Sequence, residues 1–155
     1  SLLGLKDKGF KELDNSVDTA TLAICAEAVG AMEVLYKSTV EYTKTRKQFG
    51  QAIGKFQVLQ HRMVDMFMEY EQCKSLLYMA TVKKVEDSAD AKKSISGLKF
   101  QVGKAGKFIG QQSIQLHGGM GVTDELNIGH FFKRLTTIAT IFGNTDYHLK
   151  RYSEL

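Results

Sequence analysis

The stretch from Tyr42 to Gln57 holds more binding-type side chains than a connection between helices needs. It reads Tyr-Thr-Lys-Thr-Arg-Lys-Gln-Phe-Gly-Gln-Ala-Ile-Gly-Lys-Phe-Gln and lies between two long amphipathic patterns. A helix end is commonly completed by a single glycine. This stretch has Arg46, Phe49 and the glycines Gly50 and Gly54. We therefore expect it to have a function beyond joining two helices.

Other chemistry-bearing patterns are weaker. Helical bundles build di-metal sites from Glu-x-x-His pairs, but no glutamate lies three residues before any of the four histidines, which are His61, His117, His130 and His148. Gly118-Gly119-Met120-Gly121 follows a helical pattern, whereas a dinucleotide fingerprint follows a strand. The sequence thus predicts no metal site, and each histidine is expected to be a capping or solvated residue.

The composition is that of one globular domain with a real core. The chain has 155 residues, of which 43% are hydrophobic and 25% are charged. Its 21 lysines and arginines against 17 acids give a net charge of +4. The basic residues are interleaved with acids and apolar residues, without the basic stripe that a nucleic-acid partner would need. We expect no nucleic-acid binding.

The two cysteines indicate a reducing compartment. Cys25 and Cys73 fall inside apolar helical patterns and form no Cys-x-x-Cys group, which is typical of reduced core residues. The apolar part of the start, residues 1–6, is too short for a signal peptide, and no apolar run approaches the length of a membrane span. These features predict a cytoplasmic protein that does not enter a membrane.

Apolar residues recur at steps of three and four along most of the chain, and proline is absent. We expect a lead-in over residues 1–16, an N-cap at Ser16 or Asp18, and a first helix from Val17 to Thr43. Further helices are expected over 56–80, from the turn at 88–90 to Leu116, over 126–138, and over 146–153 as a short terminal helix. The predicted fold is all-α: an up-and-down four-helix bundle with short terminal helices.

The third predicted helix carries four glycines, Gly97, Gly103, Gly106 and Gly110. Each glycine inside a helix costs about 1 kcal/mol relative to alanine. We expect the close approach of a neighbouring backbone, from another helix or another subunit, to compensate for this cost.

Three separated segments together resemble one known family. They are Arg46-Lys47-Gln48-Phe49-Gly50, Gln115-Leu116-His117-Gly118-Gly119-Met120-Gly121, and Phe142-Gly143-Asn144-Thr145. They resemble the C-terminal helical domain of the acyl-CoA dehydrogenase family, in register from about Val17 to the end. Residues 2–10 resemble the family's exit from its middle β-domain. The resemblance implies that 1–16 is a lead-in from a missing β-domain and that 17–155 is the C-terminal helical-bundle domain.

The resemblance implies FAD-dependent α,β-dehydrogenation of an acyl-CoA thioester, in fatty acid or steroid metabolism. In this reaction a carboxylate removes the α-proton, and the β-hydrogen leaves as hydride to the flavin. The implied partners are the acyl-CoA substrate, an electron-accepting flavoprotein, and further subunits in a homo- or hetero-oligomer, a dimer or tetramer. The 155 residues alone are expected to be inactive, because two domains of the family are missing.

The resemblance also implies which residues bind FAD. Arg46 would face the phosphates or adenine end of a neighbouring subunit's FAD, and Phe49 would supply a stacking surface. Thr145 matches a threonine that contacts the pyrophosphate at a helix start. The other implied cofactor-binding residues are Gln48, Ile53, Phe56, Gln57, Gln115, Gly118 and Gly119.

The chain departs from the family where the catalytic base should lie. Gly143 and Ala20 occupy the two known base positions, and neither can accept a proton. Thr21 replaces an arginine that helps to hold coenzyme A, and Leu135 replaces the aspartate of an Arg-Asp pair. The nearest remaining carboxylates, Asp124 and Asp146, are explained by capping or solvated roles.

These departures resemble the branch of small subunits of pimeloyl-CoA and steroid side-chain dehydrogenases, whose signatures match Cys25–Gly30 and Phe132–Thr136. Such subunits often pair with a base-bearing partner. The alternative is a catalytically silent assembly or scaffold subunit of a heteromeric dehydrogenase.

Overall fold

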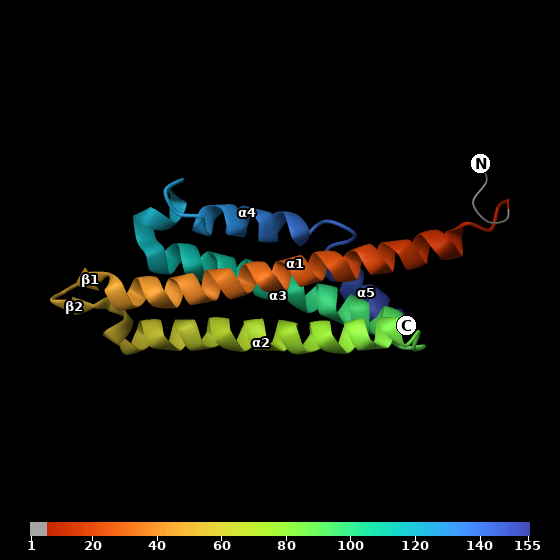
Figure 1. The fold of residues 1–155 in the computed structure, drawn as a ribbon, viewed down its shortest axis with the longest axis horizontal. Helices are drawn as coiled ribbons and strands as arrows, with labels where there is room; N and C mark the ends of the chain where they lie inside the picture. The colour runs from red at the N-terminus through yellow and green to blue at the C-terminus, as the bar shows by residue number, and fades with distance from the viewer. Residues whose placement is uncertain (1–5) are drawn as a thin grey trace.

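The computed structural model describes residues 6–155, so the first part of the predicted lead-in lies outside the described residues. Five α-helices and one two-stranded hairpin follow one another along the chain (Figure 1). This confirms the predicted all-α class. The elements are α1 (Phe10–Thr45), β1 (Lys47–Gln48), β2 (Gln51–Ala52), the 3-10 turn η1 (Ile53–Lys55), α2 (Gln57–Val85), α3 (Ala91–His117), the 3-10 turn η2 (Gly118–Val122), α4 (Ile128–Ile138) and α5 (Thr145–Glu154).

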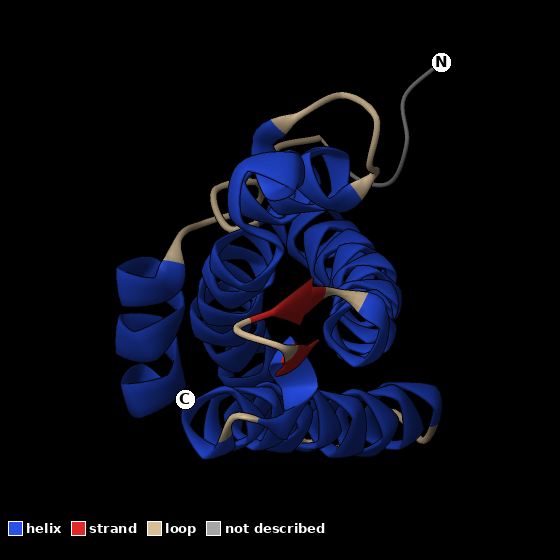
Figure 2. Ribbon diagram, turned by 90° about the vertical axis from the view of Figure 1, so that its left-hand side faces the viewer, coloured by secondary structure: helices blue, strands red, loops and turns tan. Residues whose placement is uncertain are grey.

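Helix α3 lies at the centre and packs against α1, α2, α4 and α5 (Figure 2). Helices α1 and α2 also pack against each other, and α4 covers both α3 and α1. The core between them is fully buried, with Met32 and Leu35 from α1, Met66 and Cys73 from α2, and Ile95 and Ile109 from α3. Helices this long draw most of their stability from such shared apolar faces.

Helix α1 begins at Phe10, earlier than predicted. The expected N-caps at Ser16 and Asp18 are wrong, because the Ser16 hydroxyl donates to the Glu12 carbonyl inside the helix. Asp18 is 1% exposed and accepts two hydrogen bonds from Arg151 of α5, at 2.6 and 3.1 Å. The extra turns are therefore stabilised by a contact with the far end of the chain.

The stretch after α1 forms a hairpin where the sequence predicted only a connection. Lys47 pairs with Ala52 and Gln48 with Gln51 in antiparallel register. Phe49 and Gly50 make the turn with φ of 55° and 81°. Two successive left-handed residues are the geometry of a type I′ hairpin turn. The hairpin projects beyond the ends of α1 and α2 (Figure 1).

The glycines of α3 are close to neighbouring elements, as predicted, but the neighbours are side chains rather than backbone. A Cβ at Gly103 would lie 2.6 Å from Thr145 Cγ2, and one at Gly110 would lie 2.5 Å from Phe132 Cδ2. Helices α4 and α5 therefore approach α3 closely because glycine leaves room for their side chains.

Helix α1 corrects one expectation about membranes. By length and composition alone it could cross a bilayer, although no such run was expected from the sequence. One face of α1, including Cys25, Met32 and Leu35, is buried against the other helices. The same apolar pattern therefore serves the core of the bundle.

Candidate functional site

A groove of about 660 Å³ lies at the hairpin end of the bundle. The end of α1, the hairpin and η1 form one side, the start of α2 forms the second, and the end of α3 with η2 forms the third. The lining residues are Tyr42, Arg46, Gln48, Ile53, Val58, Leu59, Arg62, Gln115, Leu116, His117, Gly118, Gly119 and Met120. The groove thus joins segments that are far apart in sequence, including six of the ten residues predicted to bind the cofactor.

An aromatic pair fixes the wall of the groove. The rings of Tyr42 and His117 stack with centroids 4.3 Å apart and planes 28° apart, and the Tyr42 hydroxyl donates to the His117 carbonyl at 3.4 Å. His117 Nδ1 lies 2.7 Å from the Ser113 carbonyl. Burial lowers the pKa of His117, so the neutral ring donates from Nδ1 and its Nε2 carries a lone pair.

The charged groups at the groove are positive. Arg46 follows the last turn of α1 and is exposed, and Arg62 Nη1 donates to Gln112 Oε1 at 3.4 Å. Among the described residues that line the groove there is no aspartate or glutamate. Guanidinium groups bind phosphate oxygens in bidentate geometry, so the groove suits an anionic ligand.

Two glycines of the groove, Gly118 and Gly119, present open backbone to its surface. A Cβ at Gly118 or Gly119 would meet no described atom within 4 Å, whereas one at Gly121 would lie 2.8 Å from the Ile114 carbonyl oxygen. Gly118 also adopts a positive φ of 61°. The open surface of Gly118 and Gly119 is what a closely approaching ligand requires.

Three further predicted residues lie beside the groove without lining it. Phe49 is 91% exposed at the tip of the hairpin, and its ring meets Phe56 edge to face, with centroids 6.1 Å apart. Phe56 is half-buried, and Gln57 is the exposed first residue of α2. The exposed ring of Phe49 is available to a ligand or subunit that approaches this end.

Thr145 lies apart from the other predicted residues. It is the first residue of α5 and packs against Gly103 in the middle of α3. Gln115 of the groove lies farther along the same helix by about 18 Å at the rise of an α-helix. The ten residues predicted to bind the cofactor therefore lie at two separate places on this chain.

Gly143 and Ala20, the two positions at which the resemblance predicts a base, carry no group that can accept a proton. Gly143 has φ of 104°, and a Cβ there would lie 2.4 Å from Tyr147 Cδ1. Ala20 is half-buried on α1, and the neighbouring Thr21 hydroxyl donates to the Val17 carbonyl at 2.7 Å. Asp124 and Asp146 are exposed.

Arg134 of α4 forms an ion pair with Glu27 of α1. Its Nε and Nη2 donate to the two carboxylate oxygens of Glu27 at 2.6 and 2.8 Å, which joins α4 to α1. The hydrogen bond from Arg134 lowers the pKa of Glu27. Arg134 therefore ties two helices together at the surface.

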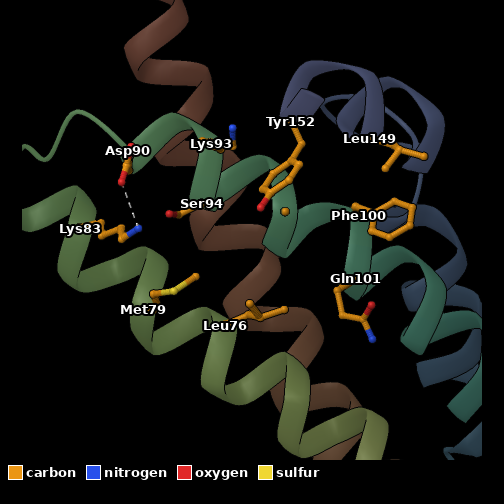
Figure 3. Close-up of a pocket in the computed structure, with 11 residues that line it drawn as sticks. Leu76, Met79, Lys83, Asp90, Lys93, Ser94, Phe100, Gln101, Leu149 and Tyr152 are labelled. Carbon is orange, nitrogen blue, oxygen red and sulfur yellow. Dashed lines mark ion pairs between the residues drawn. The ribbon is translucent and has the colours of Figure 1, made fainter. Parts of the chain in front are cut away.

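A second hollow of about 660 Å³ lies at the other end of the bundle (Figure 3). Leu76 and Met79 of α2, Phe100 of α3, and Leu149 and Tyr152 of α5 line it. A Lys83–Asp90 ion pair, with atoms 3.6 Å apart, lies at its rim. None of the residues predicted to bind the cofactor lines this hollow.

Sequence reasoning missed several groove residues, above all Tyr42, Arg62 and His117. Arg62 is the residue that a search could have found, because it lies one helical turn after Val58 on the helix that follows the hairpin. Within residues 6–155, no three histidine, cysteine or acidic side chains gather as metal ligands would.

Comparisons with known proteins agree with this geometry. The sequence profile described as "Acyl-CoA dehydrogenase, C-terminal domain" matches residues 7–154. The chain is 33% identical to acyl-CoA dehydrogenase IpdE2 of Mycolicibacterium smegmatis, over 86% of this chain and 41% of that protein. It therefore spans less than half the length of this relative.

Solved structures give the same result. The FAD complex of PigA superposes with a TM-score of 0.92 at 28% identity, covering 98% of this chain and 39% of that one. The ChsE4–ChsE5 complex of Mycobacterium tuberculosis superposes with a TM-score of 0.85 at 25% identity, covering 89% of this chain and 37% of that one. The chain belongs to the FAD-dependent acyl-CoA dehydrogenase family, as its C-terminal helical domain.

Proposed function

We propose that this chain is the C-terminal part of an acyl-CoA dehydrogenase, an oxidoreductase that introduces an α,β double bond into acyl-CoA thioesters with FAD as cofactor. Its role is to bind FAD and to join subunits. The observation that carries the proposal is the groove that Arg46 lines together with the open backbone of Gly118 and Gly119.

The groove fits the adenosine and phosphate half of FAD. Arg46 and Arg62 offer positive charge to phosphate oxygens, Gly118 and Gly119 allow close approach, and the ring of Tyr42 borders the hollow. FAD, when bound, accepts the hydride that leaves the β-carbon of the substrate. The groove residues hold the cofactor in place and take no part in proton transfer.

Because Thr145 is separated from the groove, each chain would contact two FAD molecules, its own and that of a neighbouring subunit. Thr145 at the start of α5 would contact the pyrophosphate of the FAD bound by its own subunit. Arg46, Phe49 and Gln115 would contact the FAD of a neighbouring subunit. We therefore propose an oligomer in which two subunits contact each FAD.

Gly143 and Ala20 favour a heteromer, since neither can supply the base. A partner subunit with a carboxylate would complete the chemistry. The similar structure of the ChsE4–ChsE5 complex, which joins two differently named proteins, supports this. We further propose that residues 1–16 lead in from a middle β-domain, that the protein acts in the cytoplasm, and that an electron-accepting flavoprotein reoxidises the flavin.

The test uses the protein expressed from its complete reading frame, with and without its partner subunit. We expect bound FAD and reduction of an artificial dye by acyl-CoA. Arg46→Ala should weaken FAD binding at least tenfold, since a charge-assisted hydrogen bond contributes about 1.5–3 kcal/mol. Lys55→Ala, an exposed charge in η1, is the matched control and should bind FAD normally.

The alternative is a catalytically silent assembly subunit. It is favoured by Gly143 and Ala20, because neither residue can act as the base. In that case the family motifs serve contacts between subunits. Arg46→Ala would then leave flavin retention unchanged and would alter only the yield of the complex. A colourless full-length protein that stays inactive with its partner would exclude the dehydrogenase.

A further inference from the structure

The turn between α4 and α5, residues 139–144, contains strained backbone. Phe142 has φ of 58°, a left-handed conformation in a bulky residue, and Gly143 follows with φ of 104°. A non-glycine residue in this conformation costs of order 1–3 kcal/mol and persists only where surrounding contacts hold it. Two side chains from inside the bundle provide these contacts.

Lys99 of α3 is the first of these side chains. It is 1% exposed, and its Nζ donates to the Gly143 carbonyl at 2.8 Å and to the Ala139 carbonyl at 3.4 Å. Burial lowers the pKa of Lys99, and no described carboxylate offsets this effect. Its positive end lies at the C-terminus of α4, where helix carbonyls favour a cation.

His148 of α5 is the second. It is also 1% exposed, and its Nε2 lies 2.9 Å from the carbonyl of Phe142. Burial lowers the pKa of His148, and the charges of Lys99 and Arg151 lower it further against the opposing effects of the Phe142 carbonyl and Asp18. The neutral ring therefore donates from Nε2, and its buried Nδ1 has no partner within residues 6–155.

The turn leads directly into Thr145, which α3 also holds. Gly103 lies one helical turn after Lys99 on the same face of α3, and it leaves room for Thr145 Cγ2. The Thr145 hydroxyl bonds to no described residue, unlike those of Thr136 and Thr137, which donate to carbonyls of α4. The contacts that hold the turn thus leave the hydroxyl of Thr145 available.

We propose that Lys99 and His148 are positioning residues, which hold the carbonyls of Ala139, Phe142 and Gly143 so that Thr145 presents its hydroxyl and backbone N–H to a phosphate of FAD. This rests on the proposed function. The two side chains act through the turn and do not touch the cofactor. The hydrogen bonds of Lys99 and His148 to the turn thereby have a role in placing Thr145, in addition to the packing of these side chains in the core.

The first test needs no cofactor. Hydrogen exchange of this chain in the absence of FAD should be faster over residues 139–146 in Lys99→Met and His148→Leu than in the unchanged chain, by tenfold or more. Exchange in α2 should not change. Lys107→Met, an exposed lysine of the same helix, is the control. His148→Gln keeps a donor near the position of Nε2 and should restore slow exchange. Equal acceleration in every helix would mean general destabilisation and would overturn the proposal.

The second test is a double-mutant cycle on FAD dissociation from the full-length protein with its partner subunit, followed by the fluorescence of released flavin. Thr145→Val and His148→Leu should each weaken binding about tenfold, which corresponds to ~1.4 kcal/mol. The loss in the double variant should be smaller than the product of the two single losses, because both variants remove the contact of the Thr145 hydroxyl. Losses that multiply would overturn the positioning role.

The same measurement separates this inference from the function on which it rests. If Arg46→Ala weakens FAD binding but Thr145→Val does not, the dehydrogenase assignment stands and the positioning role is wrong. If the full-length protein with its partner holds no FAD, both fail.

Discussion

The ring of Tyr147 lies where a side chain at residue 143 would begin, with its Cδ1 2.4 Å from the position of a Cβ built on Gly143. The backbone of Gly143 is also left-handed. Residue 143, at which the resemblance to the family predicts a catalytic carboxylate, is therefore closed to any side chain, for reasons of both space and conformation.

We predict that Gly143→Glu does not add activity to the full-length protein and that Gly143→Ala lowers the free energy of unfolding by about 1–3 kcal/mol. Urea unfolding followed by circular dichroism measures the second effect. Gly30→Ala is the control, because a Cβ there meets nothing within 4 Å. It should instead stabilise helix α1 by about 0.5–1 kcal/mol. Activity gained by Gly143→Glu would contradict the closed site.

The two cysteines should be inert in the folded protein. Burial raises the pKa of both Cys25 and Cys73 to about 12, and neither side chain is exposed. A thiol reacts as the thiolate, so both should stay protonated and unmodified at neutral pH. An aromatic disulfide reagent should label neither cysteine in the native protein and both in urea. Fast labelling of either one without denaturant would be inconsistent with this core.

Stability should fall on acidification, beginning with the histidines. Burial lowers the pKa of His117 and His148, so the unfolded chain takes up protons near the ordinary pKa of 6.5 while the folded chain does not. Stability is therefore complete above this pH and decreases as the pH falls below it. Urea midpoints measured from about pH 8 downwards should show the decrease. His148→Gln should reduce its size.

A second loss should follow at lower pH. The hydrogen bond from Lys92 lowers the pKa of Asp14 from its ordinary 3.8. The stability that this carboxylate contributes is present above 3.8 and is lost as the pH falls through the lower folded value. Asp14→Asn should reduce this second loss and leave the first one. A urea midpoint that stays constant over the whole acid range would contradict both assignments.

Helix α2 presents apolar side chains to solvent. Val64, Phe67 and Met68 are 54%, 42% and 52% exposed. We expect them to lie between subunits in a dimer or tetramer, because patches of this kind mark interfaces. Light scattering should report an oligomer for the unchanged chain and a smaller species for Phe67→Glu. Lys107→Glu is the control. A monodisperse monomer of the unchanged chain would count against this interface.

The periodic parts of the fold could be predicted from the sequence, because apolar spacing reports a buried helix face directly. Met66, Tyr70 and Cys73 of the second helix are buried as their spacing indicates. The start of α1 could not be predicted, since its first turns are tied to Arg151 near the other end of the chain. The hairpin was also missed, because its turn uses Phe49 and Gly50 rather than the more common Asn-Gly.

The motifs led to the groove but not to its full lining. Arg46, Gln115 and Gly118 were found because their segments are distinctive in sequence. Tyr42 and His117 were missed as site residues because their importance comes from stacking on each other across the ends of two helices. The separation of Thr145 from the groove depends on the packing of α5 against α3, which no local pattern reports.

Helix α3 connects both proposed cofactor contacts, with Gly103 and Lys99 serving one and Gln115 the other. A continuous α-helix keeps the distance and the rotation between two of its residues constant. Inserting one residue into α3 between Gly103 and Gln115 would turn one end relative to the other by about 100° and move it by about 1.5 Å. The spacing of two FAD molecules within the assembly would therefore be set by the length of this one helix.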